Sequence, residues 1–252
     1  MSDPEVQPVA ATQAGLSQWQ RVTSTFTAPS RTFEDIKRGN KSWWLPFVIM
    51  ILISYVLFAA VTFKIGWAQV AENAIHLNPK SEERLAEAPP AQRDMTMRIT
   101  QYSMEGGFAA APVLVLIIVS LGSLGLWGTI NFGFGGKATY GQIFAVWMFA
   151  SLPSIIKSIL GTIVIFAGEA PESFNMKNFA PTNVAAFLPP DTTPALYSLA
   201  TSLDVVTIWT LVLAGMGTAI VANVKRGSGY IAVFGWWVLF VLIGVGWAAV
   251  MG

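Results

Sequence analysis

The sequence contains no cysteine and only one histidine, His76. The lack of cysteine excludes disulfide bonds, thiolate nucleophiles and thiolate metal ligands. With a single histidine, neither a histidine-based metal site nor a Ser-His-Asp triad is expected. Charged residues are also scarce, at 12% of the 252 residues, about half of the share of roughly 25% in a typical soluble domain. The net charge is +1, so no general attraction to nucleic acid is expected.

Apolar residues are correspondingly frequent: 54% of the chain is hydrophobic, and the mean hydropathy is +0.56. A membrane-spanning helix needs about 20 mostly apolar residues. Five runs meet this requirement, at about 44–65, 108–131, 140–167, 195–223 and 230–251. The expected fold is therefore all-α: a polytopic membrane protein with a five-helix transmembrane bundle over residues 44–251. Pro153 should kink the third helix.

The residues before the first run fall into two parts. Residues 1–16 have no apolar periodicity and are expected to form a disordered tail. Residues 17–43 predict a cytoplasmic amphipathic segment at the membrane interface, in which Thr32 and Asp35 have the spacing of a capping box. The candidate interface anchors are Trp19, Phe26, Phe33, Trp43 and Trp44. Cations at 37, 38 and 41 suit anionic lipid, and a docking surface for a cytoplasmic partner is the alternative.

The distribution of charge predicts the orientation of the chain. With a cytoplasmic N-terminus, the cytoplasmic segments carry eight Lys and Arg residues and four Asp and Glu residues, a net charge of +4. The opposite side then carries six cationic and nine acidic residues, a net charge of −3. This asymmetry favours a cytoplasmic N-terminus, and five spans then place the C-terminus outside.

The outer loop 67–107 is too long for a simple turn and predicts a small helical cap. Two prolines at 89–90 should separate two helices of this cap. In the second helix Met95, Ile99 and Tyr102 fall on one face, and two glycines at 106–107 should end it. The carboxylates at 82, 83 and 87 are expected to lie on a solvated helix face, with a weak divalent-cation site as the alternative.

Sequence motifs for catalysis and cofactor binding fail when they are tested. The segment NFGFGGKAT has Asn131 and Ala138 where a phosphate-binding loop requires Gly and Ser or Thr. It is therefore expected to be a flexible cytoplasmic turn. No nucleophile–base set is visible, so the chain is expected to have no enzymatic activity, cofactor or metal.

Small residues at four-residue spacing predict close helix packing. One such set lies on the second span, at Gly125, Thr129 and Gly133, and another on the fourth, at Gly215 and Ala219. Packing within the bundle is the first interpretation, and a homodimer interface is the alternative.

Two charges lie inside the predicted spans, Lys157 in the third and Asp204 in the fourth. A lone charge in the hydrocarbon core is costly, so such residues usually face inward and pair. The two spans are antiparallel, so we expect both charges at a similar depth, in contact or joined through Ser154, Ser158 or Thr207. The pair would fix the helix register, or form a proton or anion site. Alternatively, Asp204 caps a helix and Lys157 extends toward the interface.

Three segments in this order resemble a bacterial member of the Yip-one (Ypt/Rab-interacting protein) membrane-domain family. They are TAPSRTFEDIKRGNKSWWLPF, GGKATYGQIFAVWMFASLPSIIKSIL and NVAAFLPPDTTPALYSLATSLDVVTIWTLVLAGMG. The resemblance covers about residue 26 to the C-terminus and implies five helices after a cytoplasmic N-terminal region in a bacterial inner membrane. Eukaryotic relatives bind small GTPases, but their Asp-Leu-Tyr-Gly tail motif is absent from residues 1–43, so GTPase binding is not carried over.

The leading functional hypothesis is a non-enzymatic membrane protein that binds or organises a partner in the bilayer. That partner would be another membrane protein, such as a transport complex, or a second copy of the chain. The alternative is a small-solute transporter or lipid-handling protein that uses the polar site at Lys157 and Asp204.

Overall fold

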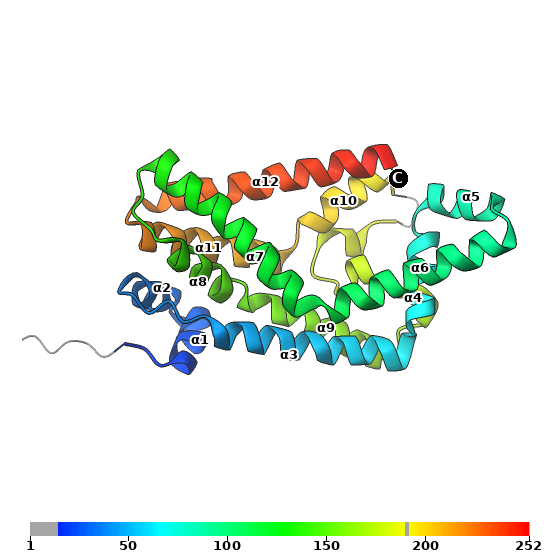
Figure 1. Cartoon of the computed structure of the whole chain (residues 1–252), viewed down its shortest axis with the longest axis horizontal. Coiled ribbons are helices and arrows are strands. Elements are labelled where there is room, and N and C mark those ends of the chain that lie inside the picture. The colour runs from blue at the N-terminus through cyan, green and yellow to red at the C-terminus, as the bar shows by residue number, and fades with distance from the viewer. Residues whose placement is uncertain (1–14, 190–191, 252) are drawn as a thin grey trace, which may run out of the picture.

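The computed structural model describes residues 15–189 and 192–251 of the chain. Within these residues five helices are long and apolar enough to cross a membrane: Trp44–Ile65, Ala111–Gly133, Tyr140–Phe166, Val205–Ala222 and Arg226–Val250. The prediction of an all-α fold with five spans is therefore confirmed. Figure 1 shows the spans running along the length of an elongated molecule, with further helices at its two ends. The predicted disordered tail lies, apart from its last two residues, outside the described part of the chain.

The spans differ in how regular they are. The first two are α3 (Trp44–Ala60) and α7 (Ala111–Gly128), and each ends in a π-helical turn. The third consists of α8 (Tyr140–Ala150), a 3-10 turn at Leu152–Ser154 and α9 (Ile155–Phe166). The kink expected at Pro153 is therefore present, since a proline cannot continue the ladder of backbone hydrogen bonds. The last two are α11 (Val205–Ala222) and α12 (Arg226–Met251).

The fourth span begins later than the sequence predicted. A separate helix, α10 (Pro194–Ser202), precedes α11, and the chain is non-helical at Leu203 and Asp204. The continuous helix predicted over 195–223 is therefore wrong. The Asp204 side chain accepts a hydrogen bond from a backbone N–H of the following turn, and aspartate is among the residues that best start a helix in this way.

The two ends of the molecule carry different helical pairs (Figure 1). At one end, α1 (Gln18–Thr27) and α2 (Pro29–Lys37) lie beside the α7–α8 loop and the α11–α12 turn. At the other end, α4 (Trp67–His76) leads to a hairpin of α5 (Pro79–Glu87) and α6 (Pro90–Ala109), which extends beyond the spans. We call them the basic end and the hairpin end. Because α6 continues through the glycines at 106–107, the helix end predicted there is wrong.

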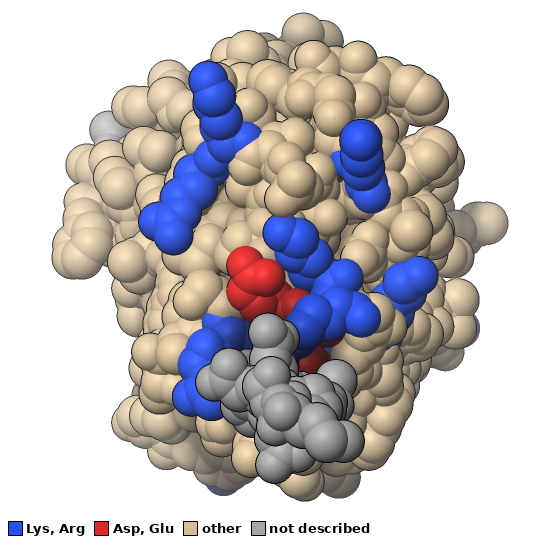
Figure 2. Space-filling view, turned by 90° about the vertical axis from the view of Figure 1, so that its left-hand side faces the viewer, with Lys and Arg blue, Asp and Glu red and all other residues tan. Residues whose placement is uncertain are grey.

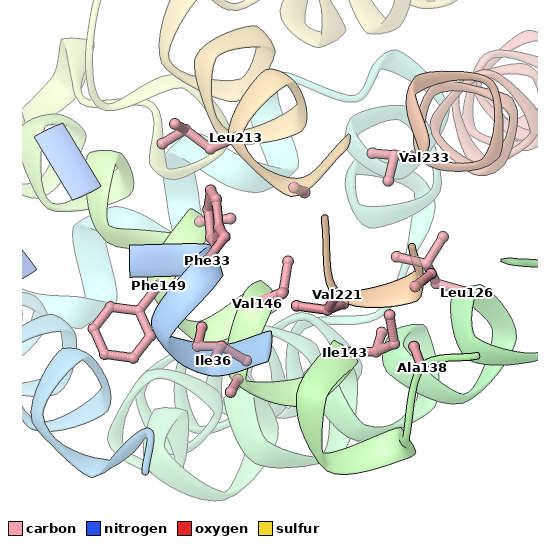
Figure 3. Close-up of a cluster of buried hydrophobic side chains, with 14 of the residues drawn as sticks. Phe33, Ile36, Leu126, Ala138, Ile143, Val146, Phe149, Leu213, Val221 and Val233 are labelled. Atoms are coloured by element: carbon pink, nitrogen blue, oxygen red, sulfur yellow. The ribbon is translucent and has the colours of Figure 1, made fainter. Parts of the chain in front are cut away.

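The main core lies toward the basic end and is centred on α11, of which 56% of the span is buried, against 11% for α12. Figure 3 shows Phe33 and Ile36 of α2 beside Val146 and Phe149 of α8. The α2 helix packs directly on α11, because a Cβ on Gly217 would come within 2.8 Å of the Phe33 ring. The α1–α2 pair is therefore part of the bundle core rather than an addition to its surface.

Candidate functional site

Asp204 is the centre of the polar site. Its carboxylate is buried, with only 1% of the side chain exposed. Oδ1 accepts a hydrogen bond from the backbone N–H of Thr207 at 2.7 Å, and Oδ2 accepts one from the Thr182 hydroxyl at 2.5 Å. These two donors hold the carboxylate at the start of α11. A carboxylate with several donors is stabilised in its charged form.

Lys157 reaches this carboxylate from α9. Its Nζ lies 3.2 Å from Oδ2 of Asp204, and 28% of the lysine side chain is exposed. The contact expected between the two charges is therefore present, and so is the cap that was its alternative. An ammonium group has three donors, and within the described residues Asp204 is the acidic partner of this one. The pair is electrically neutral but open on the lysine side.

The other residues expected at the site are placed differently. Thr207 takes part through its backbone N–H rather than its hydroxyl. The Ser154 hydroxyl instead points to Sδ of Met50, at 3.9 Å, and Ser158 offers its carbonyl to the Thr162 hydroxyl. The predicted link through Ser154 or Ser158 is therefore wrong in the part of the chain that the structure describes.

The segment before α10 supplies the partners that the sequence did not reveal. Asn183 forms an isolated antiparallel bridge with Asp204. The N–H of Val205 donates to the Thr182 carbonyl at 3.0 Å, and the N–H of Val184 donates to the Leu203 carbonyl at 3.2 Å. These bonds satisfy the backbone at the α10–α11 break, as a non-helical segment beside a span requires. The only signal in the sequence was the polar, proline-rich composition of 171–193.

The helix break also changes the depth of the site. The continuous span had placed Asp204 nine residues from its outer end. In the structure α11 has 18 residues, about 27 Å at 1.5 Å per residue, which is close to the roughly 30 Å of a hydrocarbon core. Asp204 therefore lies where α11 reaches the edge of the core, and Lys157 lies inside its own span. A register-fixing pair, an anion contact and a proton contact are all chemically compatible with this arrangement.

The candidate interface anchors separate into three groups. Trp19 and Trp44 are exposed, as anchors must be. Phe26 and Trp43 are partly buried and make edge-on contacts with Trp209 and Phe144. Phe33 is fully buried in the main core, so its prediction as an interface anchor is wrong. An apolar helix face is equally suited to a membrane or to protein, and α2 uses that face to pack on α11.

A buried arginine holds the α1–α2 pair in place. Arg21 is fully buried, and its guanidinium donates to the carbonyls of Ser42 and Asn40 at 2.7 and 2.9 Å. It also lies 4.3 Å from the centre of the Phe149 ring and 3.5 Å from a carboxylate oxygen of Asp35. Burial lowers the pKa of Arg21 to about 10, while the charge of Asp35 opposes this effect. Arg21 therefore stays charged at neutral pH.

The capping box expected at Thr32 and Asp35 is wrong. The α2 helix begins at Pro29, one turn earlier. The Thr32 hydroxyl donates to the Arg21 carbonyl at 2.9 Å. Asp35 instead accepts from the side chain of Asn40 at 2.9 Å and from the backbone N–H of Leu16 at 3.1 Å. Both side chains join α2 to α1 and to the chain around it.

Most of the small residues are used in packing within the chain. A Cβ on Gly125 would lie 3.2 Å from the Trp236 ring, and the indole N–H of Trp236 donates to the Thr129 hydroxyl at 3.0 Å. A Cβ on Gly215 would lie 2.4 Å from Cδ1 of the Tyr230 ring, so no larger residue fits there. The Ala219 methyl group faces Gly229, so α12 packs closely on both α7 and α11. Gly133 has open space beside it.

The described residues contain no group of three His, Cys, Asp or Glu side chains placed to hold a metal ion. A cavity of about 370 Å³ lies at the hairpin end, between α4 and the segment 172–174. Its polar lining includes Glu72, Asn73, His76 and Glu172. The cavity is separate from the Lys157–Asp204 pair, because neither Lys157 nor Asp204 lines it.

Five apolar spans, with a charged pair at the break in the fourth, define an all-helical integral membrane protein. The Yip1 domain model matches residues 23–248, so the chain belongs to the Yip1 domain family. The chain is 25% identical over 219 residues to a protein named membrane protein YknW from Bacillus subtilis (strain 168), and the match covers 86% of each chain. No solved structure matches the chain significantly. The resemblance drawn from the sequence is therefore confirmed.

Proposed function

We propose that this Yip1-domain protein is a non-enzymatic membrane protein that binds a partner protein through its hairpin end. The observation that carries the proposal is the state of α5 and α6, neither of which has a buried residue. Met95, Ile99 and Tyr102 of α6 are 63%, 53% and 66% exposed. They lie at i, i+4 and i+7, on one face of the helix.

This exposure has a different meaning from that of the spans. The apolar faces of α7 and α12 suit lipid tails and need no protein to cover them. The hairpin extends beyond the spans (Figure 1), so its apolar face meets water. A contiguous apolar face in water marks an interaction site. The partner that fits is an amphipathic helix or loop of another membrane protein on the same side, such as a component of a transport complex.

The charges of the hairpin suit recognition of a specific partner. Charges of both signs border the apolar face, since Asp94, Arg98 and Glu105 lie along one side of it on α6. Mixed charges at the edge of an apolar centre resemble the rim of a protein interface. The proposal places the protein in the plasma membrane of a bacterium, with the basic end in the cytoplasm and the hairpin end outside, as the charge distribution favours.

Site-specific photo-crosslinking in intact cells tests this proposal. A photoreactive amino acid at Ile99 should give an adduct of one discrete mass. The same amino acid at Thr96, about 60° further around the helix surface by the 100° per residue of an α-helix, should give little or none. Met95→Ser with Tyr102→Ser should abolish the Ile99 adduct. An adduct of twice the chain mass would identify a second copy as the partner, and equal labelling from both positions would refute the docking face.

A second function, small-solute transport or lipid handling, is favoured by the helix break and the open side of Lys157. Discontinuous spans with polar groups at the break recur at the binding sites of transporters. Since the chain has no cysteine, Lys157→Cys would carry the only thiol. Rapid reaction with a charged, water-soluble maleimide would support a hydrated pathway. Protection of the thiol in the folded protein would support a structural pair instead.

A further inference from the structure

The α7–α8 loop at the basic end is held rigidly by hydrogen bonds. The Asn131 amide donates to the Ala138 carbonyl at 2.8 Å and accepts from the Ala138 N–H at 3.0 Å. The Trp127 indole N–H donates to the same carbonyl at 3.0 Å. Gly135 has a φ of 67°, a left-handed conformation that favours glycine. The flexible turn expected from the sequence is therefore wrong, and the loop presents its side chains in a fixed arrangement.

Three segments that are distant in the sequence meet where this loop contacts the α11–α12 turn. The N–H of Lys137 donates to the Ala222 carbonyl at 3.0 Å. The ammonium of Lys37, on α2, lies 3.1 Å from Oδ1 of Asn223. Lys225 and Arg226 follow in the same turn and are exposed, as is Lys137. Four cationic residues are thus attached around one turn of the chain.

Little negative charge opposes these cations within the described basic end. Asp35 is buried against Arg21, and Glu34 is the exposed carboxylate on α2. Figure 2 shows this end of the molecule with Lys and Arg side chains spread over the surface and the acidic side chains confined to one small area. Among the described residues, this surface therefore carries an excess of positive charge.

An exposed aromatic residue lies beside the cations. Phe132 is 82% exposed, although its ring packs edge-on against Trp127, with 5.7 Å between the ring centroids. It belongs to the last turn of the second span, Ala111–Gly133. Lys137 lies just beyond that span, and Lys225 and Arg226 lie where α12 begins. Cations and an exposed aromatic ring thus meet at the level where spans end, which is where lipid headgroups meet acyl chains.

We propose that this surface binds the phosphate groups of anionic phospholipids in the adjoining leaflet. Lys37, Lys137, Lys225 and Arg226 provide the positive charge, and Phe132 lies against the first methylene groups of the acyl chains. The rigid loop avoids the ordering cost that a flexible binding loop would add. Each basic residue near an anionic membrane surface contributes about fivefold in affinity. This proposal concerns the basic end and does not depend on the partner proposed for the hairpin end.

Thermal unfolding of the detergent-solubilised full chain, followed by tryptophan fluorescence, tests the proposal during titration with dioctanoyl phosphatidylglycerol. Phosphatidylglycerol should raise the Tm, whereas phosphatidylcholine with the same tails and glycerol 3-phosphate should raise it little. The variant K137Q/K225Q/R226Q should need at least about tenfold more phosphatidylglycerol for the same rise. The control R84Q/R98Q/K177Q removes three exposed cations outside this surface and should respond like the wild type.

Three results would overturn the proposal. The first is an equal rise in Tm with phosphatidylcholine, and the second is an equal loss of response in the control variant. The third is a Tm rise with a polyglutamate peptide at concentrations where phosphatidylglycerol has none, which would assign the surface to an acidic protein segment. Native mass spectrometry of bound lipids provides a readout that does not depend on stability, should the triple variant be less stable by itself.

Discussion

The two helical pairs outside the spans, α1–α2 and α5–α6, differ in how they are held. The first pair contributes Phe33, Ile36 and Arg21 to the interior, all fully buried. The second contributes no buried residue. Both pairs combine polar residues with an apolar helix face, although α6 is much longer than α1, α2 or α5. An apolar helix face in the sequence therefore predicts that the face is buried against something. Only the structure shows whether it is buried against the chain's own core.

This difference separates structural residues from functional candidates. In α1–α2 the apolar face and the buried charges are satisfied inside the molecule, so changing them should cost stability. In α5–α6 the apolar face is satisfied by nothing in the described chain, so changing it should cost binding and leave stability nearly unchanged. The predictions below test this separation, from the largest expected effect to the smallest.

The largest effect is expected at Asp35. Asp35→Asn keeps the shape of the side chain but leaves the fully buried Arg21 without its nearest counter-charge. Leaving a buried charge without its partner typically costs about 3–5 kcal/mol. Unfolding followed by tryptophan fluorescence in detergent should show this loss. The control, Glu87→Gln on the exposed surface of α5, should leave the unfolding midpoint unchanged. Equal unfolding midpoints for the two variants would refute the stabilising role of the Arg21–Asp35 pair.

A slightly smaller effect is expected at Phe33. Phe33→Ala removes a ring with no exposed surface and leaves a cavity beside Gly217 and Val146, which costs about 3 kcal/mol or more. Ile99→Ala is the matched change in the α5–α6 pair and should alter the free energy of unfolding by less than about 0.5 kcal/mol. Chemical denaturation of both variants gives the comparison. A large loss with Ile99→Ala would mean that the Ile99 face of α6, and not only Met104 and Phe108, packs against the bundle.

The sequence predicted the parts of this fold that depend on length and composition alone. Five apolar runs gave five spans, because backbone groups in lipid leave few alternatives to a helix. The burial of Phe33 was not predictable, since the same amphipathic face suits lipid and protein. The break before α11 had a visible signal, an aspartate suited to starting a helix, but evenly apolar residues around it hid the break. Thr182 was missed because contacts between loops depend on tertiary structure.

An intermediate effect is expected at the Lys157–Asp204 pair. Lys157→Met leaves the carboxylate with two hydrogen-bond donors but no cation, and the partial exposure of Lys157 moderates the loss to about 2 kcal/mol. Asp204→Asn in the Lys157→Met background removes the orphaned charge and keeps an oxygen to cap α11. Thermal unfolding in lipid nanodiscs should therefore show the double variant to be more stable than Lys157→Met alone. A double variant that is less stable would contradict the pairing.

The smallest effect on stability is expected at the exposed face of α6. Ile99→Ser should change the free energy of unfolding by less than about 0.5 kcal/mol, because the side chain is mostly in water. The same change should abolish the adduct formed by a photoreactive amino acid at Tyr102. Thr96→Ala on the same helix is the control and should preserve the adduct. An adduct unaffected by Ile99→Ser would remove this face from the interface.

The central claim is that the two ends lie on opposite sides of the membrane, the basic end in the cytoplasm and the hairpin end outside. Since the chain lacks cysteine, single cysteines test it directly. In intact cells stripped of any outer barrier, a membrane-impermeant maleimide should label Thr96→Cys, on α6, at once. It should label Lys225→Cys, at the α11–α12 turn, only after the membrane is permeabilised. Immediate labelling of Lys225→Cys together with protection of Thr96→Cys would contradict the account.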